Sequence, residues 1–435
     1  MTTSYDPGSI AEYTRVLDGP FSASPRVQRW ARPLVIRQLE RLQWGHLRLF
    51  EGDSVTTYGR GESAHGEAPL DAEIHVQDDR FFSKLALGGS IGAAEAFMAG
   101  HWTSGDLTSV LRLVLRHRDL LDGMEKGWAR LAAPLRQAFH AVRSNTRSGS
   151  RRNIFAHYDL GNDFFDLFLD PRRMYSCAVF ERPDTSLEEA SIAKLDRICR
   201  KLDLQPTDHV VEIGTGWGGF ALHAAAVYGC RVTTTTISQS QFEHARKAVE
   251  AAGLEDLVEV VQKDYRDLTG RYDKLVSIEM IEAVGDRFLD TFFGKCSDLL
   301  KPEGLMVLQG ITIADQHFER YRRSVDFIQR YIFPGSQLIS VGSLATSVAR
   351  ATDLRMVHLE DIGPHYALTL CAWCDRFLAN REKAQEMGFA EPFLKMWEYY
   401  FCYCEAGFEE RSIGDVQVVL AKPANQRPVV LGDLA

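Results

Sequence analysis

The chain has 435 residues, more than a single hydrophobic core usually organises, so two domains are expected. Hydrophobic residues make up 45% of it and charged residues 25%, which is typical of a globular protein, and the net charge of −9 argues against a nucleic-acid partner. No apolar run is long enough to span a membrane, and the N-terminus lacks the basic-then-apolar pattern of a signal peptide, so we expect a cytoplasmic protein.

Arginines dominate the first predicted element, at residues 26–48. The segment holds one acid, Glu40, and several arginines among apolar residues such as Trp30 and Trp44. The arginines are Arg26, Arg29, Arg32, Arg37, Arg41 and Arg48. One interpretation is a basic helix that lies on anionic lipid headgroups, and the other is a core helix whose arginines are solvated. Pro33 supports the second, because proline disfavours a helix interior, and the sequence leaves both open.

The segment after Arg48 alternates between apolar and polar residues and contains many turn residues, which predicts short strands. Residues 89–100 are rich in small side chains and predict a helix, and residues 105–143 predict a longer helical stretch. Residues 142–153 are polar, with almost nothing apolar, and form the predicted linker. We therefore expect a smaller, mixed α+β domain at residues 1–141.

From about residue 190 onward, predicted strands and helices alternate. Apolar spacing predicts helices at 191–204, 238–253 and 287–304, and strands at 209–214, 230–238, 257–264, 272–280 and 304–313. This alternation is typical of an α/β domain with a doubly wound, Rossmann-like sheet, which we assign to residues 154–435. Ligands bind such sheets at the carboxyl ends of the strands, so we expect the site there.

A glycine loop follows the first of these strands. It contains Gly214, Gly216 and Gly218, and Glu212 precedes it on the strand. Glycines allow a tight turn and a close approach of the backbone to a ligand, although nicotinamide and flavin enzymes use a similar loop. The GxGxG spacing favours S-adenosylmethionine, and so does the second strand, which ends in Thr235-Thr236-Ile237-Ser238 without an acid for a ribose. A dinucleotide site and a purely structural turn remain alternatives.

Five ordered stretches carry a more specific signal. They are HYDLGNDFFDLFLDPRRMYSCAVF at 157–180, VVEIGTGWGG at 210–219, QKDYRDL at 262–268, SIEMIEAVG at 277–285 and RYIFPGSQLISV at 330–341. Together they resemble the cyclopropane-fatty-acyl-phospholipid synthase family, which includes the mycolic acid methyltransferases, over roughly residues 150–420. The resemblance implies a methyltransferase sheet and an enzyme that uses S-adenosylmethionine to modify the double bond of unsaturated acyl chains in phospholipids. It also implies a homodimer formed through the N-terminal domain. The lipid-facing interpretation of the basic segment would place that domain at the inner face of the membrane.

The resemblance further assigns site residues. Those expected to bind the cofactor are Tyr175, Ser176, Glu212, Gly214, Gly216, Gly218, Thr236, Ile237, Gln241, Tyr265 and Arg266. Cys177, Glu282 and Tyr366 would surround a bound bicarbonate, together with the segment from Gln309 to Ile311. Cys404 matches a cysteine traditionally assigned to the active site, although methyl transfer to an alkene needs no protein nucleophile.

The chain departs from the family pattern at two positions. Gln309 and Ala283 both stand where the cyclopropane synthases carry His. Glutamine can donate a hydrogen bond to an anion but cannot titrate. Two products therefore stay open: a cyclopropane, and a methylene- or methyl-branched acyl chain that a separate reductase could saturate. A small-molecule methyltransferase and a non-catalytic lipid-binding module are further alternatives.

The cysteines are scattered along the chain. Cys371 and Cys374 form a CxxC, and Cys402 and Cys404 form a CxC, both in aromatic-rich helical sequence without the turn glycines of a zinc knuckle. We predict buried, reduced thiols here and no metal site.

Overall fold

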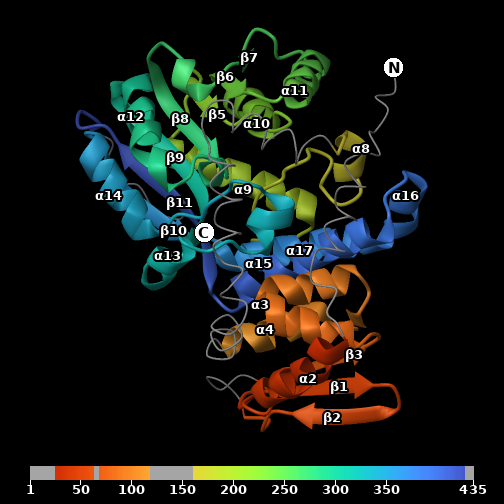
Figure 1. The fold of residues 1–435 in the computed structure, drawn as a ribbon. Coiled ribbons are helices and arrows are strands. Elements are labelled where there is room, and N and C mark those ends of the chain that lie inside the picture. The colour runs from red at the N-terminus through yellow and green to blue at the C-terminus, as the bar shows by residue number, and fades with distance from the viewer. Residues whose placement is uncertain (1–24, 63–67, 118–159, 427–435) are drawn as a thin grey trace. The chain divides into compact units, whose positions relative to one another are not determined.

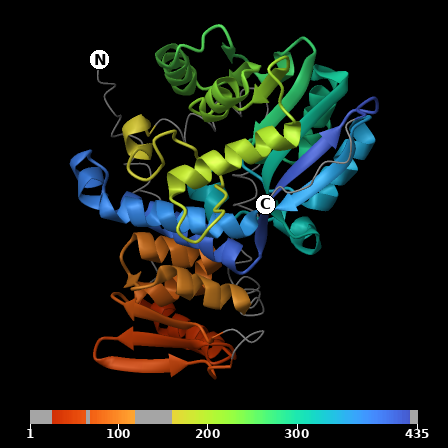
Figure 2. The same cartoon turned by 180° about the vertical axis from the view of Figure 1, so that it is seen from behind.

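A computed structural model describes residues 25–62, 68–117 and 160–426. The chain divides into two compact units, whose elements are seen from opposite sides in Figures 1 and 2. The predicted linker at 142–153 lies outside the described residues. None of the helices in the described ranges is both long and apolar enough to cross a membrane.

The first unit combines helices with a small sheet. The helices are α2 (Pro25–Leu39), α3 (Arg80–Met98) and α4 (Leu107–Arg116), and the sheet has the order β2-β1-β3-β4. Its strands are β1 (His46–Glu51), β2 (Ser54–Tyr58), β3 (Asp71–Val76) and β4 (Trp102–Thr103). The short strands expected after residue 48 are thus confirmed. The helix predicted at 89–100 begins earlier, because α3 continues through a kink at Gly89, and most of the predicted 105–143 helix lies outside the described residues.

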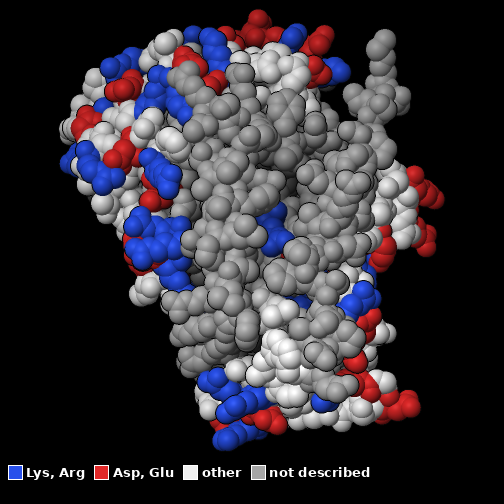
Figure 3. Space-filling model, in the orientation of Figure 1, with Lys and Arg blue, Asp and Glu red and all other residues white. Residues whose placement is uncertain are grey.

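The predicted basic helix at 26–48 is too long. Helix α2 ends at Leu39, and the chain then turns at Gly45, where φ is +65° and an added Cβ would lie 2.4 Å from the Leu70 carbonyl oxygen. Arg32 donates two hydrogen bonds, of 2.8 and 2.7 Å, to Glu51, and Arg48 donates one of 3.3 Å to Glu73. Basic and acidic residues accordingly occur together at the lower end of Figure 3. The lipid-facing interpretation of this segment stays a prediction.

The first unit also recruits later parts of the chain. It includes Ser324–Ile332 and Trp373–Ser412, so the division differs from the contiguous 1–141 and 154–435 domains that we predicted. Helix α17 (Glu391–Glu409) packs against α3 and α4, and the next residue, Glu410, accepts hydrogen bonds from Arg112 and Arg116 at 2.8 and 2.7 Å. Apolar and charged contacts together attach this helix to the N-terminal elements.

The second unit is built on a seven-stranded sheet of order β10-β11-β9-β8-β5-β6-β7. The strands are β5 (His209–Ile213), β6 (Arg231–Thr236), β7 (Val258–Gln262), β8 (Tyr272–Ile278), β9 (Leu300–Ile313), β10 (Arg355–Asp361) and β11 (Ile413–Ala421). The five neighbouring strands β9, β8, β5, β6 and β7 pair in parallel. Strand β11 is antiparallel to both of its neighbours, β9 and β10. The predicted doubly wound α/β sheet is confirmed, and β10 and β11 are additions that the sequence analysis missed.

Helices cover both faces of this sheet (Figure 1). Alternate strand residues point to opposite faces, so Val210 packs in one core cluster and Val211 in the other. The Val210 cluster includes residues of α9 (Leu187–Leu202), α10 (Gly219–Tyr228) and α11 (Gln239–Ala252). The Val211 cluster includes residues of α12 (Leu289–Leu299) and α14 (Val341–Ala351). Continuous apolar strands therefore build two cores and leave the strand ends for a site.

Shorter and later elements complete the described chain. They are α8 (Asn162–Phe165), η2 (Tyr265–Asp267), η3 (Ile281–Ala283), η4 (Asp286–Phe288), α13 (Asp315–Tyr321), η5 (Ile328–Ile332), α15 (Gly363–Ala379) and α16 (Arg381–Glu386).

Candidate active site

The glycine loop lies at the carboxyl end of β5. Gly214, Gly216 and Gly218 have φ values of +103°, +53° and +94°, which side-chain-bearing residues rarely adopt. The backbone N–H groups of Gly214 and Thr215 donate to the Thr235 carbonyl, and these bonds fix the turn against β6. A Cβ added at Gly216 would meet nothing within 4 Å, so bare backbone faces open space there. Such a cradle fits a ligand that approaches the main chain closely.

Glu212 precedes the loop and is buried. Its Oε2 accepts a 2.5 Å hydrogen bond from the Thr234 hydroxyl of β6. Burial raises the pKa of Glu212 to about 8, although the bond from Thr234 opposes this shift. In the described structure, Glu212 thus ties the ends of β5 and β6 together.

The end of β6 carries uncharged polar groups. The Thr236 hydroxyl donates to Gln241 Oε1 at 2.9 Å, and both side chains are buried. Ser238 caps α11 by accepting from the Gln241 N–H. Ile237 joins these residues in one turn, so the predicted cofactor contacts of this strand do lie together. Their contact with a ligand stays a prediction.

Two further pairs of predicted cofactor residues are held by their neighbours. Arg266 pairs with Asp264 at 2.6 Å, and its guanidinium carbon lies 5.5 Å from the Tyr265 ring centroid. Tyr175 packs edge-on against Phe165 and Phe168, and Ser176 Oγ accepts a 2.7 Å bond from Lys194 Nζ. These side chains are pre-positioned within the second unit.

Glu279, directly after β8, is the centre of the polar cluster. Its Oε1 accepts hydrogen bonds of 2.7 Å from the Cys177 N–H and from Gln309 Nε2, and its Oε2 accepts one of 2.6 Å from the Tyr366 hydroxyl. Glu279 has a φ of +47°, unusual for a residue other than glycine. The structure therefore brings the predicted residues Cys177, Gln309 and Tyr366 together around a carboxylate that the sequence analysis did not single out.

Two more carboxyl groups lie beside Glu279. Asp415 of β11 accepts from Gln309 at 3.1 Å, and its Oδ1 is buried without a hydrogen-bond partner. Glu282 accepts a 2.6 Å bond from the Ile311 N–H, and its Oε2 is likewise buried without a partner. Burial and the nearby Glu279 raise the pKa of Glu282 to about 8 and that of Asp415 well above its usual range. Both groups are therefore expected to be neutral acids at neutral pH.

A chain of hydrogen bonds fixes the orientation of the Gln309 amide. Lys201 can only donate, and its Nζ lies 2.6 Å from Gln417 Oε1. Gln417 Nε2 then donates to Gln309 Oε1 at 3.0 Å, which leaves Gln309 Nε2 to face Glu279. The register supports this chain, because Gln309 lies opposite Gln417 in the β9–β11 ladder. Gln309 is thus a hydrogen-bond donor to the site.

Comparison with known proteins assigns the chain to a family. The family model of mycolic acid cyclopropane synthetase matches residues 145–418, more than half of the chain. The chain belongs to this family. It is 39% identical over 370 residues to the tuberculostearic acid methyltransferase of Mycobacterium tuberculosis, covering 83% of this chain and 84% of that protein. It is 36% identical over 365 residues to the cyclopropane-fatty-acyl-phospholipid synthase of Escherichia coli, covering 83% and 90%.

Solved structures agree with this assignment. The mycolic acid cyclopropane synthase CmaA1 complexed with SAH and CTAB has a TM-score of 0.59 and 32% identity, over 62% of this chain and 98% of that one. The open glycine cradle at the end of β5 fits a ligand of the same kind. This cyclopropane synthetase family member is an S-adenosylmethionine-dependent methyltransferase.

A bound bicarbonate does not fit the residues of this family member as they stand. Cys177, Gln309 and Tyr366 were expected to surround that ion, but their donors hold the carboxylate of Glu279. The Cys177 N–H and the Tyr366 hydroxyl each have a single hydrogen, which Glu279 engages, and the two hydrogens of Gln309 Nε2 go to Glu279 and Asp415.

The cysteines of this family member differ in burial. Cys177 is buried, and burial, with the nearby Asp415 and Glu279, raises the pKa of its thiol well above the usual value. Cys404 belongs to the first unit, and burial raises its pKa too, so neither is suited to act as a thiolate. Cys371 is exposed, which corrects the prediction of a buried thiol, because it lies on an outward face of α15 beside the exposed Leu368.

Several site residues of this methyltransferase were not predicted from the sequence. Lys194 and Lys201 are buried on one face of α9, seven residues apart, in line with Ile198. Lysines within an apolar helical stripe were a signal that could have revealed them. Glu279 also had a signal, since it directly follows a buried strand. Asp415 lies on a strand that was not predicted and had none.

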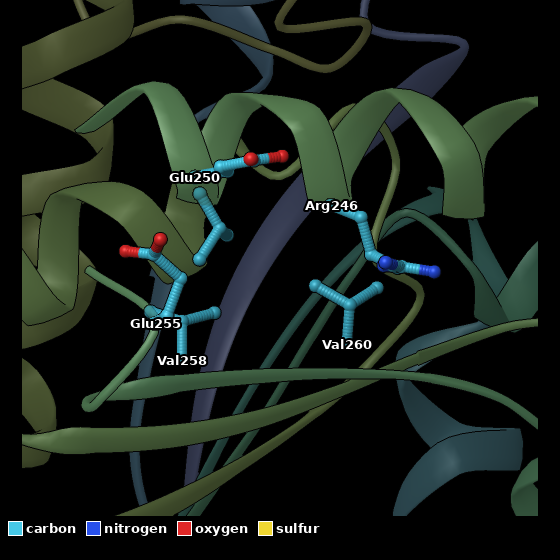
Figure 4. Close-up of a pocket in the computed structure, with 6 residues that line it drawn as sticks. Arg246, Glu250, Glu255, Val258 and Val260 are labelled. Atoms are coloured by element: carbon cyan, nitrogen blue, oxygen red, sulfur yellow. The ribbon is translucent and has the colours of Figure 1, made fainter. Parts of the chain in front are cut away.

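A separate cleft of about 320 Å³ lies between α11 and β7 in this family member (Figure 4). Arg246 and Glu250 of α11 line it together with Val258 and Val260 of β7. Val258 is the first residue of β7, so the cleft lies toward the amino end of that strand, away from the glycine loop. It is therefore distinct from the candidate active site.

Proposed function

We propose that the enzyme transfers a methyl group from S-adenosylmethionine to the double bond of an unsaturated acyl chain in a membrane phospholipid, forming a cyclopropane. The observation that carries this proposal is the Glu279 carboxylate, which three donors hold beside the neutral acids Glu282 and Asp415. A base fixed at the sheet edge is what a reaction through a carbocation needs. The similarity to cyclopropane-fatty-acyl-phospholipid synthase supports the lipid substrate.

Binding and orientation would come first. The glycine loop, Thr236, Gln241 and Tyr265 would hold S-adenosylmethionine, which supplies an electrophilic methyl group when bound. An alkene is a weak nucleophile, so the protein must align its π bond with the methyl group and keep water away. The aromatic side chains of Tyr175, Phe165 and Phe168 would supply apolar walls for this purpose.

Charged and aromatic side chains of the protein would then stabilise the carbocation that methyl transfer produces. The π electrons form the new carbon–carbon bond, and positive charge develops on the other alkene carbon. A carboxylate and aromatic groups stabilise such charge in an apolar site. When a proton leaves the new methyl group, the electrons of its C–H bond close the ring.

A branched product is the second candidate. Loss of a proton from a neighbouring chain carbon would give a methyl-branched olefin. A hydride shift from the methyl-bearing carbon to the cationic carbon, followed by loss of a proton from the new methyl group, would give a methylene branch. A separate reductase would saturate either product. The 39% identity to a tuberculostearic acid methyltransferase favours this outcome. Ring closure keeps first place because the replacement of a titratable His by Gln309 is offset by Glu279, a titratable carboxylate within 2.7 Å of it.

The test combines binding and product analysis. Purified protein is titrated with S-adenosylmethionine in a calorimeter and then incubated with vesicles of anionic phospholipid that carry cis-monounsaturated acyl chains. Gas chromatography–mass spectrometry of the methyl esters should show a cyclopropane ester, whereas a methylene ester would support the second candidate. Cofactor binding without any change in the lipid would contradict the proposed substrate.

Two accessory proposals concern the first unit. We expect it to mediate association with the inner membrane surface and formation of a homodimer. Vesicle co-sedimentation and analytical ultracentrifugation of the full chain test these expectations. A monomer that remains in the supernatant would contradict both.

A further inference from the structure

We propose that Glu279 is the general base of this enzyme and that its carboxylate takes the place of a bound bicarbonate. The inference rests on the proposed function and adds the residue that removes the proton. It follows from the hydrogen bonds, backbone conformation and charges around Glu279.

Donors from three separate segments converge on the carboxylate. The Cys177 N–H precedes α9, the Gln309 amide lies on β9, and the Tyr366 hydroxyl lies on α15. The same three residues were predicted to surround a bicarbonate. Bicarbonate and a glutamate side chain both present a planar pair of carboxylate oxygens, so one set of donors can serve either. Here the protein supplies the anion itself.

The backbone at Glu279 is shaped to aim this side chain. A φ of +47° costs about 1–2 kcal/mol for a residue with a Cβ, and three hydrogen bonds to the carboxylate offset that cost. The Glu279 N–H donates to the Gln309 carbonyl at 2.9 Å, which fixes the residue to β9 on its other side. Strain of this kind is concentrated at functional sites.

Among the three neighbouring carboxyl groups, Glu279 is the one expected to be ionised. The nearest titratable groups are Cys177, Lys194, Glu282, Tyr366 and Asp415. Glu279 accepts three hydrogen bonds, whereas Asp415 and Glu282 each accept one and each have a buried oxygen without a partner. Burial raises the pKa of Glu279 too, but the hydrogen bonds from Tyr366, Cys177 and Gln309 and the nearby Lys194 oppose that rise. Hydrogen bonds to the charged form favour ionisation, so the proton is placed on Asp415 and Glu282. Burial lowers the pKa of Lys194, and the attraction of the nearby Glu279 opposes this shift, so the charged forms of the two groups favour each other.

The proposed step balances without a further reactant. One C–H bond of the lipid cation breaks, and its electron pair forms the closing carbon–carbon bond, or a π bond in the branched product. The proton passes to an oxygen of Glu279, which becomes a neutral carboxylic acid. Solvent takes the proton between turnovers.

The experiment compares Glu279→Gln and Glu279→Gly with the wild type in carbon-dioxide-free buffer and in buffer with added bicarbonate. Glutamine keeps the size of the side chain and removes its basicity. Glycine adopts positive φ without strain and opens the space that the carboxylate fills. Glu255→Gln, an exposed residue at the cleft between α11 and β7, is the matched control.

We expect wild-type product formation to change less than twofold when bicarbonate is removed. Glu279→Gln should form product at least about 100-fold more slowly in both buffers, because a general base contributes about 10²–10⁴-fold. Glu279→Gly should be equally slow without bicarbonate and should recover at least tenfold with it. S-adenosylmethionine affinity should stay within about threefold in all variants.

A second readout does not depend on turnover. The ¹³C resonance of labelled bicarbonate should broaden or shift with Glu279→Gly and not with the wild type. Bicarbonate binding by the wild type, loss of its activity on removing bicarbonate, or near-normal turnover of Glu279→Gln would each overturn the inference. If the wild type forms no product in any buffer, the proposed function fails, and the bicarbonate titration still decides whether Glu279 occupies the anion site.

Discussion

Along the carboxyl edge of the second unit's sheet, the β5–β6 half presents backbone, hydroxyl and amide groups around the Glu212 carboxyl group, whereas the β8–β9–β11 half brings together the carboxyl groups of Glu279, Glu282 and Asp415. The first half comes from one stretch of chain, from Glu212 to Gln241, and glycine conformation shapes it. The second half collects Cys177, Glu279, Gln309, Tyr366 and Asp415 from distant segments. A short motif can therefore specify a ligand cradle, while acid–base groups are assembled only by the complete sheet.

Replacing Lys201 should change stability most, because this lysine begins the hydrogen-bond chain that leads through Gln417 to Gln309 in the acidic β8–β9–β11 half. Lys201 is 1% exposed and donates to Glu360 and to Gln417. Lys201→Met would remove one of the two cations that pair with Glu360, the other being Arg197, and would leave the buried Gln417 Oε1 without this donor, so the free energy of unfolding should fall by about 2–3 kcal/mol in chemical denaturation. Arg200→Met, at an exposed position of the same helix, should change it by less than about 0.5 kcal/mol. Equal losses in both variants would mean that the buried network does not organise this half.

The second prediction concerns the glycine loop of the β5–β6 half and its affinity for the cofactor. Gly214 has a φ of +103°, and an added Cβ would lie 3.3 Å from Met280. Gly214→Ala should therefore distort the loop and weaken S-adenosylmethionine binding about tenfold, or about 1.4 kcal/mol, in calorimetry. Gly253→Ala is the control, since this residue caps α11 at a φ of +64° with nothing within 4 Å of an added Cβ. It should lose stability without losing affinity. Unchanged affinity in Gly214→Ala would place the cofactor elsewhere.

The smallest effect is a pH dependence in the β5–β6 half. Burial raises the folded-state pKa of Glu212 from 4.5 to about 8, so the folded state holds a proton that the unfolded state releases above about pH 4.5. The stabilisation from this proton is complete below about pH 4.5 and is lost as the pH rises through about 8. Between pH 7 and pH 8, the wild type should lose about 1 kcal/mol of unfolding free energy relative to Glu212→Gln. Parallel pH curves for the two proteins would show that Glu212 is already ionised.

The sequence alone predicted the half of the fold and site that is encoded locally. Apolar periodicity identified β5 to β9 and the helices between them, and the GxGxG spacing located the loop. The resemblance brought Cys177, Gln309 and Tyr366 into one hypothesis, and the structure does gather them.

Strands β10 and β11 and their site residues could not be predicted, because their structure depends on tertiary pairing. β10 and β11 are strands because they pair with β9, and no local pattern states that partner. Asp415 and Gln417 therefore had no visible role before the register with Ile311 and Gln309 was known. The basic segment at 26–48 was predicted as one helix because its periodicity continues past Leu39, where Gly45 turns the chain.

Strand β11 also has a consequence for biosynthesis. It spans Ile413–Ala421, enters the sheet between β9 and β10, and supplies Asp415 and Gln417 to the acidic half. During translation, a nascent chain can form the glycine loop long before this strand leaves the ribosome. The complete acidic half should therefore form late, because closure of such sequence-distant contacts is slow. A chain released early would present the cofactor cradle and Glu279 without Asp415 and Gln417, the two partners that β11 supplies to Gln309.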